Sequence, residues 1–329
     1  MEMTYFGESG ILISRIGLGL AALGRPGYIN LGHANDLNRD YDIDNMERRT
    51  HDMLDAAVGH GINYIDAAQS YGKSENFLSS WLKGKADDEV VVGSKWGYTY
   101  TADWQVDAEQ HEVKEHSIIV LNRQWRLSHK KLAPSLKLYQ VHSATFESGI
   151  LDNSQVLDRL AEIQDKGILI GLSLSGAQQS EVLKKAMKIS VEGKLLFDAV
   201  QVTSNILEHS TDQVLEEATD RGMGVIIKEG LANGRLTSRN TDSTYSEVLT
   251  LLKKLADEHN VGMDAIALSY LLSKPYHHVI LSGAATEEHL NSNLMSSSIE
   301  LSKKELNALD NLQLDSRRYW KERSQMDWN

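Results

Sequence analysis

Short runs of apolar residues recur along the chain, and a longer stretch with helical periodicity separates most runs from the next. The short runs are rich in β-branched residues, as buried strands are, whereas the longer stretches repeat apolar positions every three or four residues. The predicted strands span residues 14–21, 62–68, 89–95, 136–143, 168–175, 197–204, 223–229 and 277–284. The clearest predicted helices span residues 74–85, 153–167, 179–190 and 210–222.

Regular alternation of strand and helix predicts a parallel sheet, because parallel neighbours need a crossover connection. The strands are nearly continuous apolar runs, which indicates a sheet covered on both faces, and eight such units favour a closed barrel over an open sheet. No low-complexity tract or linker divides the 329 residues. We therefore predict an α/β fold, a single (β/α)8 TIM barrel that forms one domain over residues 1–329.

Two segments near the N-terminus depart from a minimal strand–helix unit. Residues 3–16 have the pattern of a β-hairpin with Gly7 and Gly10 around its turn, and we expect this hairpin to close the bottom of the barrel. Residues 24–45 are rich in Gly, Asn and Asp and show no periodic pattern, which is typical of an active-site loop. This long loop offers Tyr28, His33 and Tyr41 as candidate walls of a pocket.

The C-terminal segment, residues 316–329, is polar except for a few aromatic side chains that include Trp320 and Trp328. Tryptophans in a polar tail need an apolar surface to cover. We expect this tail to fold over the barrel mouth and to form apolar walls of the substrate pocket.

Polar side chains stand where the predicted strands end. In (β/α)8 barrels the chemistry lies at this C-terminal face. Tyr71 follows one turn beyond the second strand. The candidates at the strand ends themselves are Asp66, Lys95, His142, Ser173, Gln201 and Lys228.

Four of these residues together can donate a proton to a carbonyl group. A tyrosine hydroxyl, with a free pKa of about 10, is a weak acid unless a positive charge stabilises its anion, and Lys95 offers that charge to Tyr71. A buried lysine needs a carboxylate partner, which Asp66 supplies from the adjacent strand. His142 can orient the carbonyl oxygen or share in the proton transfer. Each residue alone has a structural explanation, but the four at successive strand ends indicate a catalytic site.

Composition narrows the classes of partner. The formal net charge of −12 argues against a general affinity for nucleic acid or anionic membranes, so a small molecule is the expected partner. The chain contains no cysteine, and its N-terminus lacks the basic and apolar regions of a secretory signal. We therefore expect a cytoplasmic protein.

Two apparent motifs are discounted. The stretch GLGLAA, residues 17–22, resembles a dinucleotide fingerprint, but no helix follows it. The stretch HEVKEH, residues 111–116, places its histidines five positions apart, on different faces of a helix. We predict an exposed helix start there and no metal site.

The stretch GINYIDAAQSYGKSE, residues 61–75, together with VVVGSKWG and KLYQVHS further along, resembles the aldo-keto reductases. The Asp, Tyr, Lys and His tetrad of that family falls on Asp66, Tyr71, Lys95 and His142. The resemblance implies a (β/α)8 barrel that binds NADP(H) and passes hydride between the nicotinamide and an aldehyde or ketone. Tyr71 would be the general acid in reduction and the general base in oxidation.

The same resemblance implies contacts around the nicotinamide. Ser173 and Gln201 match positions that hold its carboxamide, although Leu174 stands where an asparagine is common. Lys228 and Leu231 belong to the segment after the seventh strand, where this chain lacks the aromatic residue that often stacks on the nicotinamide ring. Lys228 is expected near the pyrophosphate.

A further set of contacts is implied at the adenosine half of the cofactor. Gly283, Ala284 and Thr286 precede a predicted helix and are expected to bind phosphate there. Asn293 matches an adenine-contacting asparagine, and His289 takes the place of an arginine that clasps the 2′-phosphate. The resemblance to the family as a whole implies NADP(H). Because histidine binds phosphate less well than arginine, use of both cofactors or a preference for NAD(H) is the alternative.

The leading hypothesis is therefore an NADP(H)-dependent reductase or dehydrogenase that acts on an aldehyde, a ketone or a sugar-like hydroxyl. The alternative is a nucleotide-sensing regulatory subunit of the same fold with little turnover. A third hypothesis, a lyase or isomerase with Lys95 as a Schiff-base amine, requires a lysine without an aspartate partner. The sequence leaves the substrate, the direction of reaction and the number of subunits open.

Overall fold

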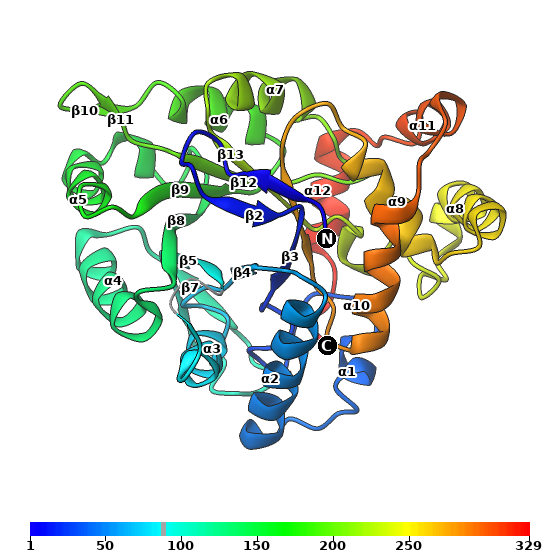
Figure 1. Ribbon diagram of the computed structural model, residues 1–329, viewed down its shortest axis with the longest axis horizontal. Coiled ribbons are helices and arrows are strands. Elements are labelled where there is room, and N and C mark those ends of the chain that lie inside the picture. The colour runs from blue at the N-terminus through cyan, green and yellow to red at the C-terminus, as the bar shows by residue number, and fades with distance from the viewer. Residues whose placement is uncertain (87–89) are drawn as a thin grey trace.

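Eight parallel strands close into a barrel in the computed structural model, which describes residues 1–86 and 90–329 (Figure 1). Strands pair in chain order, and the last pairs with the first to close the ring. The barrel strands are β3 (Ile16–Gly19), β4 (Tyr64–Asp66), β5 (Val91–Trp96), β8 (Leu136–Ala144), β9 (Leu169–Leu174), β12 (Ala199–Thr203), β13 (Gly224–Lys228) and β14 (Val279–Ser282). The predicted TIM barrel is confirmed. Glu89, the first residue of the predicted third strand, lies outside the described residues.

A ring of helices covers the outside of the barrel (Figure 1). These helices are α2 (Ile43–Gly59), α3 (Ser74–Leu82), α4 (Ile118–Leu132), α5 (Ser154–Gln164), α6 (Gln179–Ala186), α7 (Asp212–Asp220), α8 (Ser246–His259), α9 (Met263–Leu272) and α10 (Glu287–Leu294). The helices predicted in the four clearest segments are confirmed as α3, α5, α6 and α7, and each ends earlier than predicted. Gly84, Gly167 and Gly222 follow three of these helices with φ near 80–90°, a backbone turn that ends a helix.

The N-terminal hairpin closes the bottom of the barrel, as predicted. Strand β1 (Met3–Tyr5) pairs antiparallel with β2 (Leu12–Ser14), and Figure 1 shows the two strands lying across the barrel. Phe6 and Ile13 of this hairpin join Tyr64 and Ile226 in an apolar cluster inside the barrel. A side chain at Gly224 would collide with the Phe6 ring, so close packing requires glycine there.

The prediction of an exposed helix start over residues 111–116 is wrong. Strand β7 (Glu112–Lys114) lies there and pairs antiparallel with β6 (Tyr98–Tyr100). His111 stacks on Trp328, with ring centroids 3.9 Å apart. The partners of this segment come from residues 98–100 and from the C-terminal tail, which a local pattern does not reveal.

The prediction of an irregular loop over residues 24–45 is wrong in part. The short helix α1 (His33–Asp36) forms within it, and α2 already begins at Ile43. His33 is fully buried, so it is a packing residue of the loop. Tyr28 lines a cavity at the barrel mouth, described below, whereas Tyr41 packs beside a separate apolar cluster.

The C-terminal tail reaches the barrel mouth. It contains α12 (Ser316–Ser324) and then returns to the long loop, where the backbones of Tyr28 and Asn329 exchange two hydrogen bonds of 3.1 and 3.2 Å. The remaining elements are α11 (Lys303–Asp310), β10 (Ser190–Val191), β11 (Lys194–Leu195) and the 3-10 turns η1 (Ile150–Asp152), η2 (Ala232–Gly234), η3 (Ser243–Tyr245) and η4 (Met295–Ser298). Within residues 1–86 and 90–329, no helix has the length and apolar character needed to cross a bilayer.

Candidate active site

A cavity of about 980 Å³ opens where the barrel strands end. This is the size of a small-molecule or cofactor site. Lys95, Ser173 and Thr286 are not among the residues that line the cavity. The predicted site residues that do line it are Asp66, Tyr71, His142, Gln201, Lys228, Leu231, Gly283, Ala284, His289 and Asn293.

A buried ion pair lies at and beneath the floor of the cavity, where only Asp66 lines it. Lys95 at the end of β5 donates to Asp66 at the end of β4, and also to the carbonyl oxygen of Ala67 at 3.1 Å. Each of the two charged residues is 1% exposed. The second carboxylate oxygen of Asp66 accepts from Nε2 of Gln201 at 2.9 Å. Both charges are therefore compensated, as burial requires.

Tyr71 lies above this pair. The Lys95 ammonium is 4.9 Å from the centre of the Tyr71 ring, and the His142 ring meets it edge-on with centroids 5.6 Å apart. Burial and the Asp66 carboxylate raise the pKa of Tyr71 well above its usual value, and nearby Arg25 opposes this rise. Tyr71 is therefore protonated at neutral pH, as a proton donor must be.

His142 is held neutral. Burial and the cations Lys95 and Lys228 lower its pKa well below the usual value. Its backbone carbonyl accepts from Nε2 of His116 at 2.9 Å, and the next residue, Ser143, has a φ of 52°. The Ser143 amide donates to Oγ of Ser173 at 2.8 Å. Ser173 thus supports the backbone beside His142.

Gln201 fits a nicotinamide carboxamide. Its Nε2 is used by Asp66, while its Oε1 is buried and has no hydrogen-bond partner in the part of the chain that the structure describes. A buried carbonyl oxygen without a donor is costly, and a carboxamide N–H would satisfy it. Leu174, the departure noted beside Ser173, is fully buried in the core and offers no polar group.

The segment between β14 and α10 fits phosphate. A side chain at Gly283 would meet nothing within 4 Å, so this backbone is open to a ligand. Thr286 caps α10 by accepting from the His289 amide at 3.3 Å, which leaves its O–H as a donor. Asn293 donates to Oγ of Ser282 at 2.9 Å and is 3% exposed.

Lys228 at the end of β13 belongs to a second charged group. It donates to Oγ1 of Thr203 at 2.6 Å and lies 3.7 Å from Glu229. Burial lowers the pKa of Lys228 to about 8. Burial would raise the pKa of Glu229, but Arg323 of the tail and Lys228 outweigh it and lower that pKa to about 2. The tail therefore helps to hold a carboxylate in the cavity wall.

The sequence analysis missed two wall residues, Arg25 and Glu112. Arg25 is 3% exposed, and its guanidinium lies 5.2 Å from the Tyr71 ring and 4.7 Å from the Trp328 ring. Its Nη1 donates to Glu112 at 3.1 Å. No local pattern marks either residue, because Glu112 reaches the cavity only through the unforeseen β6–β7 pairing.

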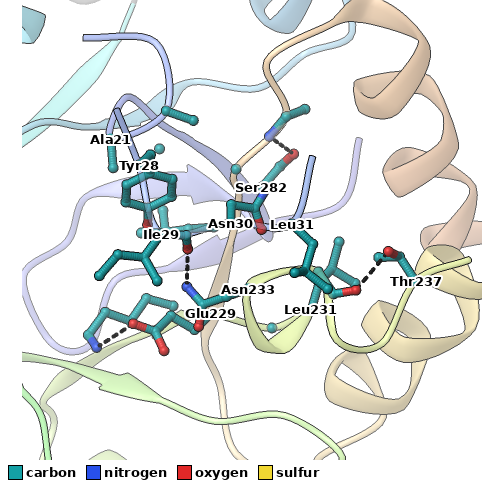
Figure 2. A pocket seen from close by; sticks show the side chains of 18 of the residues that line it. Ala21, Tyr28, Ile29, Asn30, Leu31, Glu229, Leu231, Asn233, Thr237 and Ser282 are labelled. Carbon is teal, nitrogen blue, oxygen red and sulfur yellow. Dashed lines mark hydrogen bonds and ion pairs between the residues drawn. The ribbon is translucent and has the colours of Figure 1, made fainter. Parts of the chain in front are cut away.

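The long loop joins the segment after β13 across the cavity. Nδ2 of Asn233 donates to the carbonyl of Ile29 at 2.9 Å, and the Leu31 amide donates to the carbonyl of Asn233 at 3.1 Å. Figure 2 shows Ile29 and Asn233 facing each other across this junction. We call these contacts of residues 29–31 with Asn233 the clasp.

A model of a known protein family matches most of this chain. Residues 15–313 match the model described as "Aldo/keto reductase family". The chain is 24% identical over 330 residues to the aldo-keto reductase ausK of Emericella nidulans, covering 92% of this chain and 79% of that one. It is 22% identical over 329 residues to the oxidoreductase YqkF of Bacillus subtilis, covering 94% and 95% of the two chains.

A solved structure agrees on the fold. The aldo-keto reductase AKR11C1 from Bacillus halodurans, in its holo form, superposes with a TM-score of 0.71 at 20% identity, and the match covers 96% of this chain and 97% of that one. The matched region of the family model contains all eight barrel strands and every residue of the cavity floor. The chain therefore belongs to the aldo/keto reductase family and is an oxidoreductase enzyme of that family.

Proposed function

We propose that this enzyme transfers hydride between a nicotinamide cofactor and a small carbonyl or alcohol substrate, with Tyr71 as general acid and base. The observation that carries the proposal is the buried Asp66–Lys95 pair beneath Tyr71, with neutral His142 at its side. A protonated hydroxyl, a fixed cation and a neutral imidazole are the groups that carbonyl reduction needs.

The bound cofactor would supply the hydride. In reduction, Tyr71 gives its proton to the substrate oxygen, and Lys95 stabilises the tyrosinate that forms. Asp66 keeps Lys95 in place, since the ammonium is buried and needs an opposite charge. His142 can donate one hydrogen bond to the same substrate oxygen and so orient the carbonyl. Oxidation of an alcohol follows the reverse course.

For the cofactor we propose NADP(H), with NAD(H) as the alternative. The unpaired Oε1 of Gln201 and the open backbone at Gly283 support a nicotinamide dinucleotide in the cavity. Although His289 replaces the expected arginine, Arg239 lies beside it, with 2.9 Å between Nη2 and Nε2. A guanidinium suited to a 2′-phosphate is therefore present, but it comes from another segment.

The substrate half of the cavity is aromatic and charged. Tyr28, Tyr98, Trp320 and Trp328 line it together with Arg25 and Glu112. Aromatic faces beside charged groups suit a substrate that has both an apolar part and polar substituents. The absence of cysteine supports a reducing compartment, so the cytoplasm is the location we propose.

Of the two competing hypotheses, the structure weighs against the Schiff-base enzyme. A Schiff base needs a lysine free of a carboxylate partner, and Lys95 donates to Asp66. A sensor with little turnover would bind nucleotide equally well, so turnover has to separate the two.

The test is a fluorescence titration of the purified protein with NADPH and NADH, followed by steady-state assays on a panel of aldehydes, ketones and alcohols. Binding of either cofactor with turnover supports the proposal. Binding with negligible turnover on every substrate would favour the sensor, and no binding of either cofactor would refute the proposal.

A further inference from the structure

An ionic cluster lies at the end of the cavity that contains His289. It joins Asp36 on α1, Arg239 in the segment after β13 and His289 in the first turn of α10. These three residues, which we call the rim cluster, come from distant parts of the sequence and all line the cavity. Figure 2 shows the neighbouring part of this wall, where Leu31 and Thr237 lie on the two segments that carry the cluster.

Arg239 already uses most of its hydrogen-bonding capacity. Its Nη1 donates to Asp36 at 2.7 Å and to the carbonyl of Leu31 at 3.2 Å. Its Nη2 donates to the other Asp36 oxygen and to Nε2 of His289 at 2.9 Å. A guanidinium has five N–H groups, so only Nε–H is left for a ligand. A phosphate can therefore gain a bidentate contact through both terminal nitrogens of Arg239 only by displacing Asp36.

Asp36 is suited to a different ligand. Its side chain is 6% exposed and is held between Arg239 and His289, whose Nδ1 lies 3.9 Å away. A carboxylate beside a phosphate dianion is repulsive, whereas it accepts readily from a ribose hydroxyl. Glu288 adds a second negative charge near Arg239. The rim cluster thus combines one group that favours a 2′-phosphate with one that favours a free 2′-hydroxyl.

We propose that Asp36 determines the cofactor preference of this enzyme, because it competes with the 2′-phosphate of NADP(H) for Arg239. As a result, the enzyme accepts NAD(H) alongside NADP(H). This inference rests on the proposed function, since it requires a nicotinamide dinucleotide in the cavity. It adds that the balance between the two cofactors is carried by a residue of α1.

The experiment measures dissociation constants for NADPH and NADH by fluorescence titration in the wild type and in Asp36→Asn. The wild type should bind both cofactors. Asp36→Asn frees Arg239 and removes the repulsion, so NADPH should bind about tenfold more tightly, while NADH binds equally well or a few-fold more weakly. Glu288→Gln is the matched control: it removes one charge from the same rim but leaves the Asp36–Arg239 pair, so it should move the ratio much less.

A double-mutant cycle tests whether Asp36 acts through Arg239. Arg239→Gln should weaken the binding of NADPH about tenfold and the binding of NADH much less, because only NADPH has a 2′-phosphate for the guanidinium. In the Arg239→Gln background, Asp36→Asn should lose most of its effect on NADPH. Thermal melts of each variant verify that the fold is retained.

Three outcomes would overturn the inference. If Asp36→Asn weakens NADPH, Asp36 orients Arg239 for phosphate instead of competing with it. If the ratio of the two dissociation constants stays the same, the rim cluster does not discriminate between the cofactors. If neither cofactor binds even to the wild type, the proposed function fails, and the inference fails with it.

Discussion

The two ends of the cavity are built in different ways. At the end where we propose that the reaction takes place, the reaction end, Asp66, Lys95 and His142 stand on barrel strands, and Lys95 is 1% exposed. At the rim cluster, the corresponding groups stand on loops and short helices, and the Arg239 side chain is 32% exposed. Barrel register fixes the first set, whereas side-chain pairing fixes the second. Positions on strands keep their spacing when one residue changes, but a cluster held by its own ion pairs can rearrange.

The largest effect is expected at the reaction end, from Tyr71→Phe. This change removes the proposed proton donor and keeps the ring, so kcat should fall by about a hundredfold to ten-thousandfold, the scale of general acid–base catalysis. The dissociation constant of the cofactor should stay nearly the same. Steady-state kinetics and the fluorescence titration measure the two quantities. Tyr98→Phe, which removes another hydroxyl from the same cavity, should cost far less, and an active Tyr71→Phe enzyme would mean that the tetrad is misassigned.

The second largest difference between the two ends should be in the free energy of unfolding lost when an ion pair is broken. Asp66→Asn leaves the Lys95 charge buried without a partner, so the free energy of unfolding should fall by about 3–5 kcal/mol. Asp36→Asn breaks a pair whose arginine is partly exposed, and should cost about 1 kcal/mol or less. Urea unfolding at neutral pH measures both. Equal losses would show that the pair on the strands is no more important for stability than the pair on the loops.

Acid should lower the free energy of unfolding through His33, which lies in the long loop. Burial lowers the pKa of this histidine to about 4, below its unfolded value of about 6.5, so the unfolded state binds more protons between these values. Stability is therefore lost as the pH falls from about 6.5 to about 4, by up to about 3 kcal/mol for this residue. Urea unfolding at pH 7 and pH 4.5 measures the loss. His33→Phe should reduce this pH dependence, and an unchanged dependence would contradict the assignment.

The smallest expected effect concerns the tail. Trp328 stacks on His111 and lies over Arg25, so Trp328→Ala should raise KM for the carbonyl substrate about threefold to tenfold. The cofactor dissociation constant should hardly move, because Trp328 lies near Tyr71 and not at the rim cluster. Steady-state kinetics with varied substrate at a fixed, saturating cofactor concentration measure this KM. A change confined to the dissociation constant of the cofactor would show that the tail contacts the cofactor and not the substrate.

The barrel and the meeting of Asp66, Lys95 and His142 at one face of it could be predicted from the sequence, because both follow from short-range patterns and barrel topology. The strands are nearly continuous apolar runs, and each polar residue at a strand end reaches the same face of a closed barrel. Asp66 and Lys95 are 29 residues apart, yet neighbouring parallel strands must bring them together. Here, local pattern and topology were sufficient.

The rest of the cavity depends on contacts between loops. Arg239 meets Asp36 across 203 positions of sequence, and Asn233 meets Ile29 across 204. No periodicity links such segments. Strand β7 was missed for the same reason, since its partner strand and the stacking Trp328 are remote from residues 111–116. Polar residues in loops find partners only in three dimensions.

The clasp bears on how long a ligand stays bound. Residues 29–31 and Asn233 meet over the cavity through two hydrogen bonds, and residues of both segments line it. If a bound molecule lies beneath this junction, breaking these bonds adds a barrier to its dissociation that binding affinity alone does not report. If that barrier exceeds the barrier of the chemical step, product release and not chemistry sets the turnover rate.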